Sequence, residues 1–216
     1  NNLKQIGVAM HNYSESRKSF PAAAITSKDG KPLLSWRVSI LPYIEQKPLY
    51  DKFKLDEPWD SPTNKALIPL IPETYVCPSG KLENGMTSYR LISSGKSAYK
   101  DGKPLSASAL ASLMRSGGAG HVPLVLDAGD DHAVAWTDPR TFDSSGKIGD
   151  HHGTRGVPEL FADGSVRTRG EDGGEHTGRA MVAAPGLSDA PVSDPTDDGS
   201  KDQAKFQGAW TVTAAR

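Results

Sequence analysis

Residues 1–20 carry a helical hydrophobic pattern closed by Pro21, and no other stretch restricts the fold as strongly. The apolar side chains recur at the spacing of one helix face: Leu3, Ile6, Met10 and Tyr13. A proline pushes the residue before it out of the α region, so the helix must end ahead of Pro21. Gly7 costs roughly 1 kcal/mol relative to alanine inside a helix. The pattern predicts an amphipathic helix with one apolar side to bury.

The predicted helix starts at Asn1 with no capping residue or lead-in before it. One interpretation is the lower half of a longer helix whose upper half precedes Asn1. The alternative is an ordinary surface helix with a frayed first turn. Periodicity alone does not separate the two.

Composition sets bounds on the size of the core and on the partners. The chain has 216 residues, 36% hydrophobic and 24% charged, which is enough for one sizeable core or for a domain with a tail. The net charge of −1 favours neither nucleic acid nor a membrane surface as a partner. No apolar run reaches the roughly 18 residues of a membrane span.

Cys77 is the only cysteine, so the chain cannot form an internal disulfide. Two roles stay open for it. It is either a small buried hydrophobic residue or a thiol whose partner lies outside this sequence.

Aromatic residues are densest between positions 36 and 59: Trp36, Tyr43, Tyr50, Phe53 and Trp59. Ser35 is a favourable cap for a short helix there, and Pro42 is expected to kink or shorten that helix. The aromatic residues either pack in the core or form a platform for a ligand.

Beyond residue 73 the sequence changes to short alternating runs that are typical of strands. We expect strands at 73–77, 87–92, 122–127 and 133–136, and a short helix over 105–114. Asp163 and Gly164 separate two further strand-like runs, and Asp-Gly is a strong hairpin signal. Asp163 is therefore assigned to a turn.

After residue 169 the composition becomes rich in Gly, Asp, Ser, Ala and Pro, with almost no large apolar residues. Such a segment cannot bury enough apolar surface to order itself. The sequence predicts a globular domain over 1–169, a flexible polar linker over 170–204, and a tail over 205–216 that looks like the first strand of a further module.

Few residues are candidates for binding a metal ion or for catalysis. Asp127, Asp130 and Asp131 offer the oxygen ligands that calcium prefers, although their spacing is not that of an EF-hand loop. Asp150, His151 and His152 are the first place to seek a transition metal or an acid–base pair, but no metal-binding helical spacing surrounds them. The sequence therefore predicts neither an enzyme nor a cofactor, with calcium as the one candidate ion.

Several phrases occur together and in order: NNLKQIGVAMHNY, FPAA, LSWRVSILPYIEQKPLYDKFKLDEPWDSPTNK, YVCPSG, TSYRLISSG and FADGSVR. In this combination the chain resembles the DUF1559 family, a poorly characterised group of planctomycete-type bacteria related to type IV pilins and type II secretion pseudopilins. The resemblance covers about residues 1–169. Residues 94–120 depart from it, because the family more often has a DGTSNT-like stretch there. Residues 206–213 are similar to the opening QGxWxV phrase of a small β-rich module.

The resemblance implies an α+β, pilin-like fold in which the first helix packs on an antiparallel sheet, with short helical insertions over 33–70 at one end. It also implies a prepilin-type leader and an apolar helix before Asn1. A cysteine in that upstream region, where members often have one, would be the natural partner of Cys77.

Two functions are compatible with these expectations. The first is a non-enzymatic cell-envelope or surface protein, membrane-anchored in full length, that assembles through its N-terminal helix with other pilin-like or secretion-system subunits. The alternative is an extracellular binding module that recognises a glycan, a peptide or calcium through its aromatic and acidic loops. A hydrolase built on residues 150–152 is a third, weaker hypothesis.

Overall fold

The computed structural model describes residues 1–93, 97–100, 102–116, 118–144 and 156–169. The chain divides into two units, residues 1–181 and 182–216, and every described residue belongs to the first. The predicted linker and tail, 170–216, lie outside the described residues, as do Asp150, His151 and His152.

Helix α1 (Asn2–Arg17) forms over the stretch that the hydrophobic period predicts. Leu3, Ile6 and Met10 are buried, as expected from their spacing. Tyr13 is only partly buried, and its ring meets the ring of Tyr43 edge-on at a centroid distance of 5.7 Å. The helix ends at a left-handed Lys18, three residues before Pro21.

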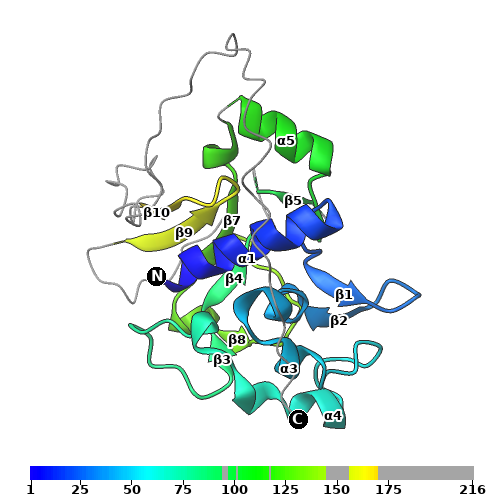
Figure 1. Cartoon of the computed structure of the whole chain (residues 1–216). Helices are drawn as coiled ribbons and strands as arrows, with labels where there is room; N and C mark the ends of the chain where they lie inside the picture. Colours follow the sequence, from blue (N-terminus) through cyan, green and yellow to red (C-terminus); the bar gives the residue numbers. More distant parts are fainter. Residues whose placement is uncertain (94–96, 101, 117, 145–155, 170–216) are drawn as a thin grey trace, which may run out of the picture. The chain divides into compact units, whose positions relative to one another are not determined.

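The main sheet is antiparallel, with its strands in the order β10–β9–β7–β4. Its strands are β4 (Tyr89–Leu91), β7 (Pro123–Asp127), β9 (Val157–Phe161) and β10 (Val166–Arg169). Helix α1 crosses one face of this sheet (Figure 1). The two approach closely at Gly7, where a Cβ atom would lie 2.8 Å from Leu160 Cδ1. The predicted α+β arrangement of a helix on an antiparallel sheet is confirmed.

The hairpin between β9 and β10 turns at Asp163 and Gly164, as the Asp-Gly signal predicts. Gly164 has a φ of 77°, in the left-handed region that glycine adopts without steric cost. The Asp163 carboxylate accepts a hydrogen bond from the Ser165 backbone N–H at 2.8 Å, which closes the turn.

Three small two-stranded antiparallel sheets accompany the main one: β1 (Ala24–Thr26) with β2 (Pro32–Ser35), β3 (Met86–Thr87) with β8 (Val134–Ala135), and β5 (Tyr99–Lys100) with β6 (Lys103–Pro104). The β1–β2 hairpin was not predicted as a pair of strands. Its second strand runs directly into a helix at Ser35, so the apolar residues before Ser35 look like part of that helix in the sequence.

Short helices fill the region between these strands: α2 (Trp36–Ser39), η1 (Leu41–Ile44), α3 (Lys47–Tyr50), α4 (Pro62–Lys65), η2 (Ile68–Leu70) and η3 (Glu73–Tyr75). Later ones are α5 (Ala107–Arg115), η4 (Gly118–His121) and η5 (Asp130–His132). Ser35 caps α2 by accepting from the Arg37 N–H, as predicted. The helix is short, as expected from Pro42: α2 ends at Ser39, and Pro42 lies in the first turn of η1.

The strand predicted at 73–77 is wrong, because residues Glu73–Tyr75 form the 3-10 helix η3. The alternating pattern was correct in marking a buried Tyr75. Among the described residues, no strand pairs with residues 73–77. Instead, the Asn2 side chain donates to the carbonyl oxygens of Glu73 and Val76, at 3.1 and 2.7 Å.

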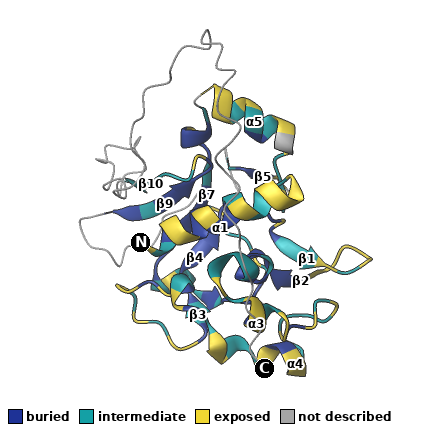
Figure 2. Cartoon of the chain, viewed as in Figure 1, coloured by how far each residue is buried: buried dark blue, intermediate teal, exposed yellow. Residues whose placement is uncertain are grey.

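The buried residues form one large core and one small one. The large core contains the apolar side of α1 together with Trp36, Tyr75 and Trp136. The small core contains Ile92, Leu126, Ala128 and Val157. Figure 2 shows α1 buried along one side and exposed along the other, with the buried strands β7 and β9 behind it.

Candidate functional site

The predicted site residues Cys77 and Asp127 meet beneath the first turn of α1. Cys77 follows η3, Asp127 ends β7, and Asp127 is paired in register with Tyr89 of β4. The Cys77 thiol is hydrogen-bonded to the Asp127 carboxylate, and the Tyr89 hydroxyl contacts Cys77 and the Asn2 side chain. All of Cys77, Tyr89 and Asp127 are buried. We call these three side chains, together with that of Asn2, the N-terminal polar cluster.

Two groups of this cluster, the Cys77 thiol and the Tyr89 hydroxyl, keep their protons because they are buried. Burial, and then the neighbouring Asp127 carboxylate, raise the pKa of the Cys77 thiol to about 11. Burial also raises the pKa of Tyr89. A thiol that stays neutral at physiological pH is a weak nucleophile and a weak metal ligand. The cluster therefore ties α1, the loop after η3 and two strands together, and its thiol is not activated.

The three predicted calcium ligands do not converge. Asp127 is buried in the polar cluster, whereas Asp131 is exposed in the first turn of η5. Asp130 accepts a hydrogen bond from the Lys81 backbone N–H at 3.0 Å and so fixes the loop after Cys77. Within the described residues, no three His, Cys, Asp or Glu side chains are grouped so as to hold a metal ion. Calcium binding gains no support from this arrangement.

The aromatic region packs into the core. Trp36 is 2% exposed and Phe53 is 6% exposed, and the ring of Phe53 lies edge-on to Trp136 at 5.6 Å. Tyr43 and Trp59 are partly buried against the same core. The Tyr43 hydroxyl is 2.6 Å from Ser16 Oγ on α1. The binding-module hypothesis required exposed aromatic side chains, so it loses its main support.

Two buried arginines were not singled out from the sequence. Arg37 is fully buried and donates to Ser35 Oγ and to the carbonyl oxygens of Trp136 and Tyr89. Arg90 is buried and donates to the carbonyl oxygens of His132, Arg140 and Thr141. Each guanidinium ties together backbone segments that are far apart in the sequence. The only sequence signal was the position of each arginine next to an aromatic or apolar run.

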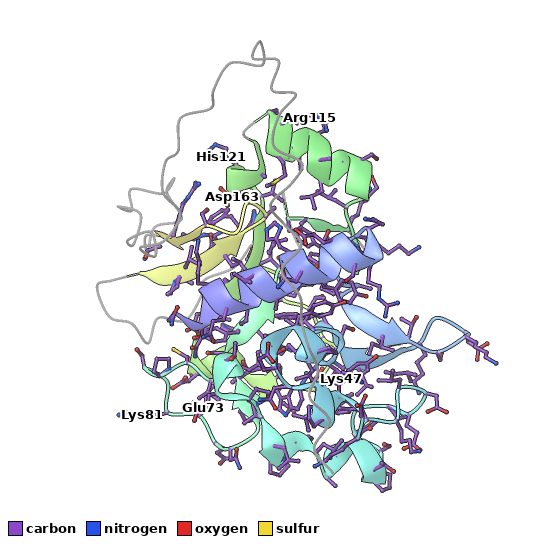
Figure 3. All side chains as sticks on the ribbon, viewed as in Figure 1. Lys47, Glu73, Lys81, Arg115, His121 and Asp163 are labelled. Atoms are coloured by element: carbon purple, nitrogen blue, oxygen red, sulfur yellow. The ribbon has the colours of Figure 1, made fainter. Side chains whose placement is uncertain are left out.

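The remaining histidines of the described part lie apart from one another. His121 is exposed at the end of η4, near the position of Asp163 in Figure 3. His132 stacks edge-on against Phe142 at 5.1 Å. The third, His11, lies on α1 under the β9–β10 hairpin. The candidate pair His151 and His152 lies outside the described residues.

A family model described as "Protein of unknown function (DUF1559)" matches residues 1–141. The chain belongs to this family. No curated protein and no solved structure matches it. The DUF1559 match covers α1, the aromatic region, the polar cluster and β7, and it ends before β9 and β10. No described helix combines the length and the apolar character needed to cross a membrane.

Proposed function

We propose that this DUF1559 protein is a non-enzymatic, pilin-like subunit of the cell envelope or cell surface, which assembles or is anchored through a helix continuous with α1. The observation that carries the proposal is the docking of α1 along one face of an antiparallel sheet, with its apolar side buried. A globular domain attached in this way can hold such a helix while presenting its loops outward.

Side-chain hydrogen bonds hold the first turn of α1 in place, which supports this role. Asn2 is bonded to two backbone carbonyls, and Lys4 Nζ donates to the Gly164 carbonyl oxygen at 2.9 Å. These contacts anchor the helix at its beginning rather than leaving it frayed. A mechanical load on an upstream helix would pass into the loop after η3 and into the β9–β10 turn.

The outer side of α1 supports contacts between subunits. Val8 is 57% exposed, although apolar residues elsewhere on the helix are buried. The expected partners are other pilin-like or secretion-system subunits, and the expected location is the cell envelope or the outside of the cell. The net charge of −1 favours no nucleic-acid partner.

The test uses the full-length reading frame. We expect a short charged leader and about 20 apolar residues upstream of Asn1, and we expect the full-length protein in the membrane fraction while the chain starting at Asn1 stays in the supernatant. An upstream segment without such a run rules out the pilin-like role.

Assembly is tested separately by cysteine cross-linking of the full-length protein in cells. Val8→Cys places a thiol on the outer side of α1, and Lys28→Cys places one on the exposed β1–β2 turn as the matched control. We expect Val8→Cys to give more cross-linked dimer than Lys28→Cys. Equal yields from the two variants contradict assembly through α1.

A further inference from the structure

Helix α1 and the β9–β10 hairpin meet at His11. One ring nitrogen of His11 is hydrogen-bonded to the Ala162 backbone carbonyl, just before the turn. The other, Nε2, is buried and has no hydrogen-bond partner among the described residues. It faces Gly164, where a Cβ atom would lie 3.5 Å away. The ring also packs edge-on against Phe20 at a centroid distance of 5.4 Å.

This geometry suits a neutral imidazole. A neutral ring with its proton on Nδ1 satisfies the Ala162 carbonyl and leaves Nε2 as a buried nitrogen without a proton. A protonated ring carries a second N–H at Nε2, and the described part of the chain offers no acceptor to it. Burying an N–H of a cation without an acceptor costs more than the loss of an ordinary hydrogen bond.

The charges around His11 do not compensate for this cost. Asp163 on the hairpin and Glu15 on α1 favour the protonated ring, whereas Lys4 on α1 opposes it. The Asp163 carboxylate is already engaged by the Ser165 N–H at 2.8 Å and lies 3.5 Å from the Arg167 guanidinium. Lys4 is held in place by its bond to the Gly164 carbonyl oxygen. Burial outweighs the carboxylates, and the pKa of His11 is lowered from its ordinary value.

We propose that the contact between α1 and the β9–β10 hairpin is a pH-dependent switch, closed when His11 is neutral and weakened when His11 is protonated. When the contact is open, His11 is solvated and binds the proton near the ordinary histidine pKa, and when the contact is closed it binds the proton only at lower pH. Acidification between those two values therefore favours opening, by up to about tenfold in the opening equilibrium for each pH unit. The proposal concerns a contact inside the domain, so it stands whether or not the protein assembles through α1.

Hydrogen exchange on the chain from Asn1 tests the switch. We compare the protection of α1 and of the β9–β10 turn at about pH 7.5 and about pH 5, after correction for the intrinsic exchange rate. The chain should lose protection in these two segments on acidification, while β4 and β7 keep theirs. His11→Gln, which removes the titration and keeps an amide donor, should show no such loss. His121→Gln, a change at an exposed histidine, should behave like the parent.

Three outcomes overturn the proposal. They are no loss of protection in the parent, an equal loss in His11→Gln, or a loss spread evenly over all strands. An NMR titration of the His11 ring in the parent chain gives an answer even when His11→Gln does not fold. A His11 pKa at or above the ordinary value of 6.5 contradicts the switch.

Discussion

Gly7 shows at the scale of one residue how packing overrides helix propensity. Alanine would favour the helix by roughly 1 kcal/mol, yet its Cβ would lie 2.8 Å from the buried Leu160 Cδ1. Real Cβ atoms do not approach so closely, so the strand and the helix would have to separate or Leu160 would have to change rotamer. The glycine lets α1 lie close to β9.

A double-mutant cycle measures this approach. Gly7→Ala changes the free energy of unfolding, and we compare this change in the parent and in the Leu160→Val variant. We expect the change to be more favourable in the Leu160→Val variant by roughly 1–3 kcal/mol, because valine has no Cδ atoms to obstruct the new methyl group. Urea unfolding of the four proteins gives the coupling free energy. A coupling free energy of zero would show that the helix and the strand are farther apart than the structure has them.

Cys77 yields a second prediction at this scale. Its thiol pKa of about 11 lies well above that of a free thiol, so the native thiolate fraction at about pH 8 should be reduced on the order of a hundredfold. A thiol-specific disulfide reagent should therefore label the native protein slowly and the protein in guanidinium chloride quickly. Fast labelling of the native protein would contradict a neutral, buried thiol.

Helix α1 is the element on which the fold depends most. Its two sides differ sharply, since Ile6 is 0% exposed and Val8 is 57% exposed. Ile6→Asp buries an uncompensated carboxylate and removes core contacts, which should cost more than about 4 kcal/mol. Val8→Asp, the matched control two residues away, should change stability by about 0.5 kcal/mol or less. Thermal melts compare the two, and similar melting temperatures would mean that α1 is not docked by its apolar side.

The elements that were predictable are those whose signal is local. The period of α1, the Ser35 cap and the Asp163-Gly164 turn each depend on residues close in sequence, and all three are confirmed. The 73–77 segment was not predictable, because Asn2 bonds its carbonyls from more than 70 positions away. The contact of Cys77 with Asp127 is likewise a product of the fold. The sequence patterns therefore predicted the buried residues more reliably than they predicted the contacts between residues distant in the sequence.

At the scale of the whole molecule, two buried groups give the stability opposite dependences on pH. Burial lowers the pKa of His11 from 6.5, so the unfolded state binds more protons and stability rises with pH through that window. Glu159 of β9 is fully buried with Arg169 Nε 3.0 Å from its carboxylate. Burial outweighs this arginine and raises the pKa of Glu159 above 4.5, so the folded state keeps the proton longer and stability falls as pH rises.

These opposite signs predict how two variants shift the pH profile of the free energy of unfolding. His11→Gln removes the contribution of His11 to the free energy of unfolding, which grows with pH. The stability at about pH 7 relative to about pH 5 should therefore be reduced. Glu159→Gln removes the contribution of Glu159, which falls with pH. The stability at about pH 7 relative to about pH 5 should therefore be increased. Urea unfolding at both pH values measures each difference against the parent. Shifts in the same direction would mean that one of the two groups does not titrate as its surroundings require, and the NMR titration of His11 would identify which.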